Sequence, residues 1–294
     1  MKRRLKIEVA CHPECQNGEA PVWSEREQAL FWIDTRGALL FRRDIHGKVD
    51  SWSLGERTGA IGLRKDGGLI ATLASGIYAI DIDGVGQPVR KALLATLDLA
   101  EGLRLKEGKT DPGGRWWFGS VDDRRTPEGS FYRLAPDGQC DVVDRGILVA
   151  NGIAFPAAGN RMFTADTLGG TVWTYDLDPS SGAVTNKRSF FSTDELPGYV
   201  DGATFDDEGY YWCAFFGDWA VARISPAGHI DRMVRLPVQY PTQCGFGGPD
   251  LDIMYVTTSL SHVKAAEAAG QPLAGALFQI TGLGVRGIPE PMFG

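Results

Sequence analysis

Short hydrophobic runs separated by polar turns recur along this chain, and their pattern indicates strands rather than helices. Residues 76–80, 130–134, 171–175 and 276–280 alternate apolar and polar side chains, as half-buried strands do. Turns that contain glycine follow several of these runs, for example at residues 136–138 and 226–228. Only residues 262–269 suggest a short helix. The pattern predicts an all-β protein.

A longer repeat is superimposed on this alternation. The repeated unit consists of a polar residue, a small residue, a turn and a short apolar strand. It occurs six times, with first residues Glu19, Thr58, Glu107, Asn151, Asp201 and Cys244. Successive first residues are 39 to 50 positions apart, which is the length of a propeller blade. The repeat predicts a six-bladed β-propeller with four antiparallel strands per blade. Residues 7–10 would supply an outer strand that closes the ring, and residues 1–294 form a single domain because no linker interrupts the repeats.

Composition and charge narrow the choice of partners. The 294 residues include 38 Gly and 16 Pro, which favours many tight turns. A net charge of −7 disfavours binding to nucleic acid or to an anionic membrane surface, and no apolar run is long enough for a membrane span. The five cysteines do not form a disulfide framework by their spacing. We therefore expect a cytoplasmic protein and leave its oligomeric state open.

The first residues of the repeats suggest chemistry. At equivalent positions in a propeller they would form a ring around the axis, and this ring carries three carboxylates and one amide. Converging carboxylates repel one another, and one divalent cation would relieve that repulsion. Oxygen atoms of Glu19, Asn151 and Asp201 suit Ca²⁺ or Mg²⁺ and also admit Mn²⁺, Fe²⁺ or Zn²⁺. The alternative is that these polar-small pairs are turn formers only.

Four segments resemble the senescence marker protein 30/gluconolactonase (SMP-30/gluconolactonase/LRE-like) family: GEAPVW at 18–23, RLKEGKTDPGGRWWFG at 104–119, NGIAF at 151–155 and FGGPDL at 246–251. The resemblance spans essentially the whole chain. It implies a six-bladed propeller and a metal-dependent lactonase with one catalytic divalent cation. It also implies that Glu19, Asn151 and Asp201 hold the metal and that Asp201 is the catalytic base.

One segment departs from the family pattern. Where relatives commonly have Arg-x-Asn-Asp-Gly, this chain reads RLKEG at 104–108, so Lys106 replaces a neutral amide. Arg104 is either a substrate ligand or a solvated loop cation. Lys106 either pairs with Glu107 or Glu101, or recognises an anionic group such as a sulfonate or carboxylate. Arg124 lies where some relatives supply a carboxylate. The candidate substrate-binding residues are therefore Arg104, Lys106, Glu107 and Arg124.

The expected reaction is hydrolysis of a sugar-acid lactone to the aldonic acid in carbohydrate catabolism. The cation would polarise the lactone carbonyl, and Asp201 would activate the attacking water. A serine-hydrolase mechanism is disfavoured because the chain contains no G-x-S-x-G motif. Two alternatives remain open: a non-catalytic propeller that binds a metal or a metabolite, and an organophosphate or ester hydrolase that uses the same site.

Overall fold

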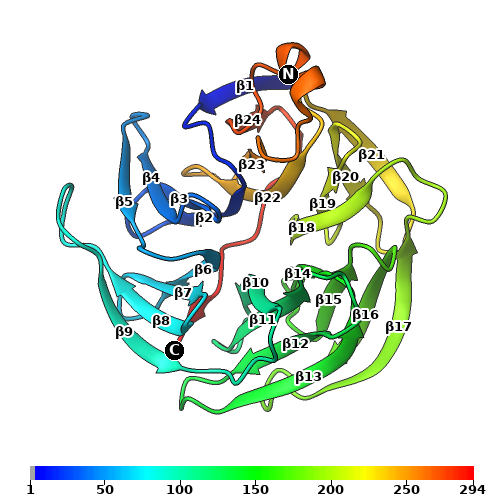
Figure 1. The fold of residues 1–294 in the computed structure, drawn as a ribbon. Coiled ribbons are helices and arrows are strands. Elements are labelled where there is room, and N and C mark those ends of the chain that lie inside the picture. Colours follow the sequence, from blue (N-terminus) through cyan, green and yellow to red (C-terminus); the bar gives the residue numbers. More distant parts are fainter. Residues whose placement is uncertain (1–3) are drawn as a thin grey trace.

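The structure is a computed structural model that describes residues 4–294, and it confirms the six-bladed β-propeller (Figure 1). Six sheets surround a central axis, and we number the blades in chain order. Blade 1 contains β2 (Gly18–Ser24), β3 (Ala29–Asp34), β4 (Leu39–Asp44) and β5 (Val49–Ser53); blade 2 contains β6 (Thr58–Arg64), β7 (Leu69–Leu73), β8 (Gly76–Asp81) and β9 (Arg90–Ala95); blade 3 contains β10 (Leu103–Thr110), β11 (Trp116–Asp122), β12 (Gly129–Leu134) and β13 (Cys140–Ile147).

The second half of the ring repeats this arrangement. Blade 4 contains β14 (Ala150–Ala154), β15 (Arg161–Asp166), β16 (Thr171–Leu177) and β17 (Val184–Ser192); blade 5 contains β18 (Tyr199–Phe205), β19 (Tyr211–Phe216), β20 (Ala220–Ile224) and β21 (Ile230–Arg235); blade 6 contains β22 (Pro241–Gly247), β23 (Ile253–Thr258), β24 (Leu277–Thr281) and β1 (Lys6–Cys11). The N-terminal strand therefore completes the last blade, as residues 7–10 predict.

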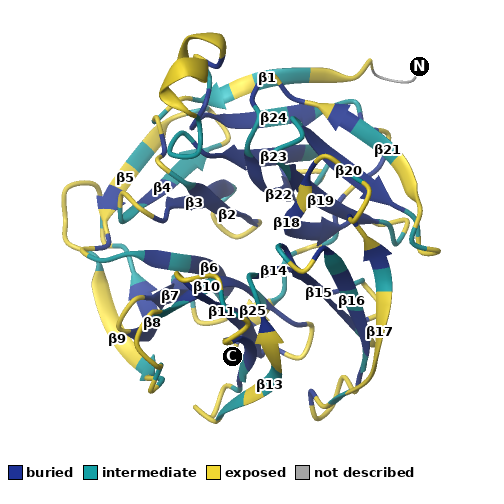
Figure 2. Ribbon diagram, turned by 45° about the vertical axis from the view of Figure 1, so that its right-hand side comes forward, coloured by how far each residue is buried: buried dark blue, intermediate teal, exposed yellow. Residues whose placement is uncertain are grey.

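The first strand of each of blades 1 to 5, and β22 in blade 6, lies nearest the axis, and burial decreases outward along each blade (Figure 2). Strands β2 and β22 are buried along their whole length, whereas most residues of β9 and β17 are exposed. This gradient follows the sequence, because most inner strands are rich in apolar and small residues and most outer strands carry Lys or Arg. The hydrophobic core consequently lies between neighbouring blades.

Trp116 shows how the blades pack. Its indole is fully buried between blades 2 and 3, and its Nε1 donates a hydrogen bond to Thr72 Oγ1 at 2.9 Å. A Cβ atom added at Gly62 or Gly108 would lie 2.5 or 2.3 Å from this ring, so both glycines are needed to make room for it. Trp116 is therefore a packing residue rather than a ligand-binding one.

The C-terminal segment adds a feature that the repeat does not predict. Strand β25 (Met292–Phe293) pairs in parallel with β6, which makes blade 2 five-stranded. Before β25 this segment contacts blade 5 through a β-bridge between Gly287 and Asp206. It also contacts blade 3 through a 2.9 Å ion pair between Glu290 and Lys109. Figure 1 shows it in red, crossing the ring. Residues 286–294 do not line the cavity described below, so the segment lies at the other end of the channel.

The helix expected at residues 262–269 is a short 3₁₀ helix, η1, at Ala265–Gly270 in the connection between β23 and β24. Its residues are Ala, Glu and Gly with no buried side chain, so no apolar face stabilises a longer helix. No helix within residues 4–294 has the length and apolar content needed to cross a lipid bilayer.

Candidate active site

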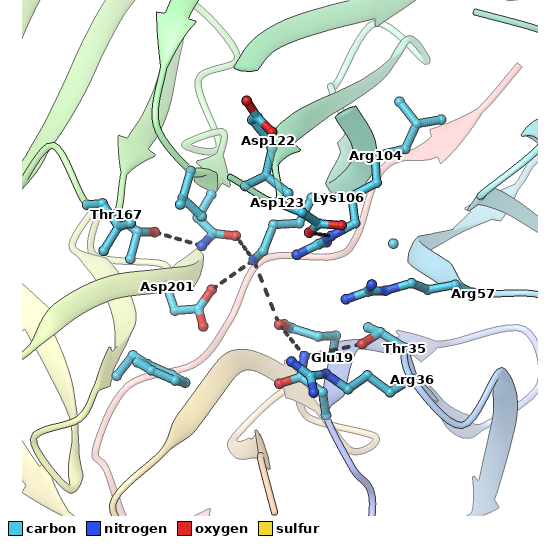
Figure 3. Close-up of a pocket in the computed structure, with 18 of the residues that line it drawn as sticks. Glu19, Thr35, Arg36, Arg57, Arg104, Lys106, Asp122, Asp123, Thr167 and Asp201 are labelled. Atoms are coloured by element: carbon cyan, nitrogen blue, oxygen red, sulfur yellow. Dashed lines mark hydrogen bonds and ion pairs between the residues drawn. The ribbon is translucent and has the colours of Figure 1, made fainter. Parts of the chain in front are cut away.

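The innermost strands carry β-bulges at the level of the expected ring. Pairing with the next strand shifts after Glu19 in β2, after Lys106 in β10, after Asn151 in β14 and after Val200 in β18. A bulge turns a side chain away from the regular alternation of the sheet. The side chains of Glu19, Lys106 and Asp201 consequently point toward one another near the axis, although they come from three different blades (Figure 3).

Two backbone positions next to these residues have left-handed conformations. Gly152, which follows Asn151, has φ of 61°, and an added Cβ would lie 2.5 Å from the Tyr211 hydroxyl oxygen. Ala20, which follows Glu19, has φ of 52°, and its N–H donates to Gln243 Oε1 at 2.8 Å. Such conformations are costly for a residue with a side chain and often occur at functional sites. They fix the direction of the two preceding side chains.

A cavity opens at the end of the channel where Glu19, Lys106 and Asp201 meet, and its volume is about 610 Å³. This volume is usual for a small-molecule site. Its buried part contains Glu19, Asn151 and Asp201, each no more than 6% exposed. Its charged lining consists of Arg36, Arg57, Arg104, Lys106 and Arg125 against Glu19, Asp122, Asp123 and Asp201. The cavity therefore combines buried acidic groups with a basic rim.

Lys106 lies between the three buried oxygen donors. Its Nζ donates a hydrogen bond to Asn151 Oδ1, lies 3.4 Å from Asp201 Oδ1 and lies 4.0 Å from Glu19 Oε1. The structure thus shows ion pairs with Asp201 and Glu19, rather than the expected pairing with Glu107 or Glu101. Its side chain is 16% exposed. A positive charge already lies where the three donors converge.

Neighbouring polar groups fix the orientation of the oxygen donors. Asn17 Nδ2 donates to Glu19 Oε1 at 3.2 Å. Asn151 Nδ2 donates to Thr167 Oγ1 at 2.7 Å, and the Thr167 hydroxyl donates to the carbonyl oxygen of Val200 at 2.8 Å. Because its Nδ2 is held by Thr167, the amide of Asn151 presents Oδ1 to the cluster. Thr167 therefore links blade 4 to the backbone just before Asp201 in blade 5.

The carboxyl groups are in an unfavourable electrostatic environment. Burial raises the pKa of Glu19 well above its usual value, and the nearby charge of Asp201 raises it further while Lys106 opposes the shift. Burial also raises the pKa of Asp201, against the opposing charge and hydrogen bond of Lys106. In contrast, burial and the charges of Arg36, Lys106 and Arg125 lower the pKa of His262 to about 4, so this cavity residue is neutral at pH 7.

Two members of the expected ring, Glu107 and Cys244, do not face the cavity. Glu107 is 4% exposed and does not line the cavity; its carboxylate accepts hydrogen bonds from the Ile153 N–H at 3.2 Å and from Gln243 Nε2 at 3.4 Å. Burial raises its pKa to about 8. Cys244, expected on the axis, instead packs in the hydrophobic cluster that contains Trp212 and Phe246. The side chain of Gln243 lies in the channel in its place.

The arginines also differ from expectation. Arg104 lines the cavity and pairs with Asp123 at 2.6 Å. Arg124 does not line the cavity, because its guanidinium bonds to Asp122 at 3.0 Å and extends into solvent. Its neighbour Arg125 lines the cavity, as do Arg36 and Arg57, and sequence reasoning missed all three. Their common signal is position, since each lies in a connection between strands, Arg36 after β3, Arg57 just before β6 and Arg125 after β11.

The chemistry of the donor set decides whether it fits a divalent cation. Residues 4–294 contain no group of three or more His, Cys, Asp and Glu side chains arranged to hold a metal. The set at the axis is instead one amide and two carboxylates, whose oxygens match the preferences of hard divalent cations. The two buried carboxylates also require positive charge beside them. By donor chemistry and charge these residues fit such a cation, provided that the Lys106 ammonium leaves its place.

The fold and this site define a six-bladed propeller with a small-molecule cavity on its axis, lined at its buried end by oxygen donors from three blades. The chain belongs to the SMP-30/gluconolactonase/LRE-like family, whose sequence profile matches residues 17–260.

Similar proteins cover nearly the whole chain. The 6-deoxy-6-sulfogluconolactonase of Pseudomonas putida is 36% identical over 278 residues, covering 94% of each chain. Regucalcin of Oryctolagus cuniculus is 32% identical over 294 residues, covering 97% of each chain. The solved structure of regucalcin from Agrobacterium tumefaciens, described as a calcium-binding protein, is 25% identical with a TM-score of 0.91, covering 97% of this chain and 96% of that one.

Proposed function

We propose that this protein is a divalent-cation-dependent lactonase that hydrolyses a sugar-acid lactone to the aldonic acid. The observation that carries the proposal is the convergence of Glu19, Asn151 and Asp201 at the buried end of a cavity large enough for a sugar ring. Membership of the gluconolactonase family and the activity in the name of the Pseudomonas putida relative support the same reaction.

Each residue of the cluster has a defined task in this reaction. Glu19, Asn151 and Asp201 would hold the cation, which when bound supplies a Lewis acid that polarises the lactone carbonyl. Asp201 accepts a proton from the water that attacks the carbonyl carbon. The ring C–O bond then breaks as the carbonyl re-forms, and the proton held by Asp201 passes to the departing ring oxygen. The product is an open-chain hydroxy acid, whose ionisation acidifies the solution.

The substrate-binding roles follow from the cavity lining. Arg104 can donate its forked N–H groups to substrate hydroxyls while its ion pair with Asp123 holds the guanidinium in place. Glu107 acts from beneath the cavity, since it bonds to the backbone of blade 4 at Ile153 and to Gln243. Arg124 acts indirectly, through its bonds to the buried Asp122 carboxylate.

The lactone we propose carries an anionic group. Within residues 4–294 the guanidinium groups of Arg36, Arg57 and Arg125 make no ion pair, yet all three line the same cavity. Burial, together with the charges of Arg104 and Arg36, lowers the pKa of Arg57 against the opposing charge of Asp123, so Arg57 lies in the repulsive field of two other cations. A sulfonate or carboxylate between them would relieve that repulsion. The relative named for a sulfogluconolactone is consistent with such a substrate.

A pH-indicator assay over a panel of neutral and sulfonated aldonolactones tests the reaction. Protein dialysed against a chelator is expected to be inactive and to recover with Ca²⁺, Mn²⁺ or Zn²⁺. Asp201→Asn should lose at least a thousandfold in kcat while keeping its fold, and Asp137→Asn, in an exposed turn of blade 3, should not. Cation binding without turnover of any lactone would contradict the proposal in favour of a binding propeller, and hydrolysis of phosphotriesters alone would contradict it in favour of another hydrolase.

Arg57→Gln tests the anionic group separately. We expect it to raise KM for a sulfonated lactone at least tenfold and to change KM for the matching neutral lactone by less than threefold. Lys106→Asn should be measured beside it, because Lys106 also lines the cavity and replaces the amide that relatives commonly have. An equal rise in KM for the two lactones would show that these residues do not recognise a negative charge on the substrate.

A further inference from the structure

The position of Lys106 is the feature of this site that the proposed reaction leaves unexplained. Its Nζ reaches Asn151 Oδ1, Asp201 Oδ1 and Glu19 Oε1, which are the oxygens that would hold a cation. We call these three atoms the oxygen cage. The lysine comes from blade 3, whereas the cage residues come from blades 1, 4 and 5, so the contact is not a product of local sequence.

The backbone brings Lys106 to the cage. The pairing shift in β10 falls directly after Lys106, in the same way that the shifts in β2 and β14 fall directly after Glu19 and Asn151. Gly59 of β6 lies against this point, and an added Cβ there would be 2.9 Å from Lys106 Cα and 2.9 Å from the Leu105 carbonyl oxygen. The missing side chain lets β10 approach the axis. The lysine therefore occupies the same level of the channel as the cage residues.

The charges around the cage explain why an ammonium is stable there. Glu19 and Asp201 are each 6% exposed, and with no positive group beside them two buried carboxylates would strongly disfavour the folded state. An ammonium that donates to Asn151 and Asp201 and lies 4.0 Å from Glu19 reduces that cost. The same position cannot hold both an ammonium and a dication, because the two would be in direct contact and would repel each other.

We propose that Lys106 is the resident occupant of the oxygen cage and that a divalent cation binds by displacing its ammonium into the cavity. The inference rests on the proposed function only in that both require a cation at the cage. Lys106 then sets the cation affinity of the protein, and an uncharged residue at this position gives tighter binding. The four-carbon side chain is long enough and flexible enough to withdraw, since the adjoining cavity has a volume of about 610 Å³.

Calorimetry with Mn²⁺ on chelator-dialysed protein tests this directly. We expect Lys106→Met to bind Mn²⁺ at least ten times more tightly than the wild type. The matched control is Arg57→Met, which removes a charge from the same cavity without touching the cage, and its affinity should stay within threefold of the wild type. Equal affinities of the wild type and Lys106→Met would overturn the displacement and leave the cation site standing. Failure of both to bind Mn²⁺ would overturn the displacement and the cation requirement together, while lactone turnover remains a separate measurement.

A second measurement uses the wild type alone and so does not depend on the folding of a variant. Acetic anhydride modifies free amines, and the acetylation rate at each lysine can be read by peptide mass spectrometry. Saturating Mn²⁺ is expected to raise the rate at Lys106 at least fivefold, because the ammonium leaves its buried contacts. Lys109, on the same strand and held by Glu290 at 2.9 Å, is the internal control and should not change. Unchanged or slower labelling of Lys106 with Mn²⁺ bound would overturn the proposal.

Discussion

Thr167 offers a specific test of how the oxygen cage is held, because it bonds to Asn151 of the cage and to the backbone just before Asp201 without belonging to the cage. Its hydroxyl accepts the Asn151 Nδ2–H at 2.7 Å and donates to the Val200 carbonyl at 2.8 Å. Thr167→Val keeps the shape of the side chain and removes both hydrogen bonds. The amide of Asn151 then loses the partner that directs Oδ1 toward the cage.

The size of the effect follows from these two contacts. Thr167 is 8% exposed, so the substitution leaves two buried polar groups without this partner, at about 1–3 kcal/mol each in unfolding free energy. Removing a group that orients a metal ligand typically lowers metal affinity by about 10- to 100-fold. We therefore expect Thr167→Val to lose about 2 kcal/mol or more of stability and at least tenfold in Mn²⁺ affinity.

Urea denaturation and calorimetry on metal-free protein measure these two quantities. Thr171→Val is the matched control, since its hydroxyl makes one exposed 3.3 Å hydrogen bond to Gly169 in the same blade. The control should change stability by less than about 0.5 kcal/mol and leave cation affinity unchanged. If Thr167→Val binds Mn²⁺ as tightly as the wild type, the orientation of Asn151 does not depend on Thr167 and the reasoning is refuted.

Three further substitutions test other parts of the structure. Burial raises the pKa of Glu107 to about 8, so the folded protein holds this proton more tightly than the unfolded chain does. The protein therefore loses stability as the pH rises from about 4.5 to 8. Glu107→Gln should reduce that loss of stability in urea titrations at several pH values. Arg223→Met should cost about 3–5 kcal/mol, because it leaves the fully buried Asp206 carboxylate unpaired, while the kcat of the folded variant stays unchanged. Gly152→Ala should lower the melting temperature and weaken Mn²⁺ binding, since its Cβ would meet the Tyr211 hydroxyl at 2.5 Å.

Much of this fold could be predicted from the sequence because the determinants are local and repeated. The spacing of the six polar-small pairs indicates the number of blades, and the alternation at residues 76–80 and 171–175 corresponds to β8 and β16. The parallel pairing of β25 with β6 was not predictable in this way. It involves only two residues, Met292 and Phe293, and depends on where the last blade ends in space.

The site was less predictable because a motif does not show the register of strand pairing. Aligning the chain by polar-small pairs places Glu107 and Cys244 at the level of Glu19 and Asn151, whereas in blade 3 the cavity is lined by Lys106 and not by Glu107. In blade 6 the side chain of Gln243 bonds to Glu107, whereas the side chain of Cys244 packs in the hydrophobic core. The rim cations Arg36 and Arg125 lie in turns, where hydrophobic periodicity carries no information.

The central claim is that side-chain oxygens from three blades hold one divalent cation on the propeller axis. A crystal structure of the protein grown with Mn²⁺, with anomalous diffraction recorded near the manganese absorption edge, tests it most directly. We expect one strong anomalous peak about 2.0–2.4 Å from oxygens of Glu19, Asn151 and Asp201, with the Lys106 ammonium moved into the cavity. No peak at that position in crystals saturated with Mn²⁺, with Lys106 still bonded to Asn151, would contradict it.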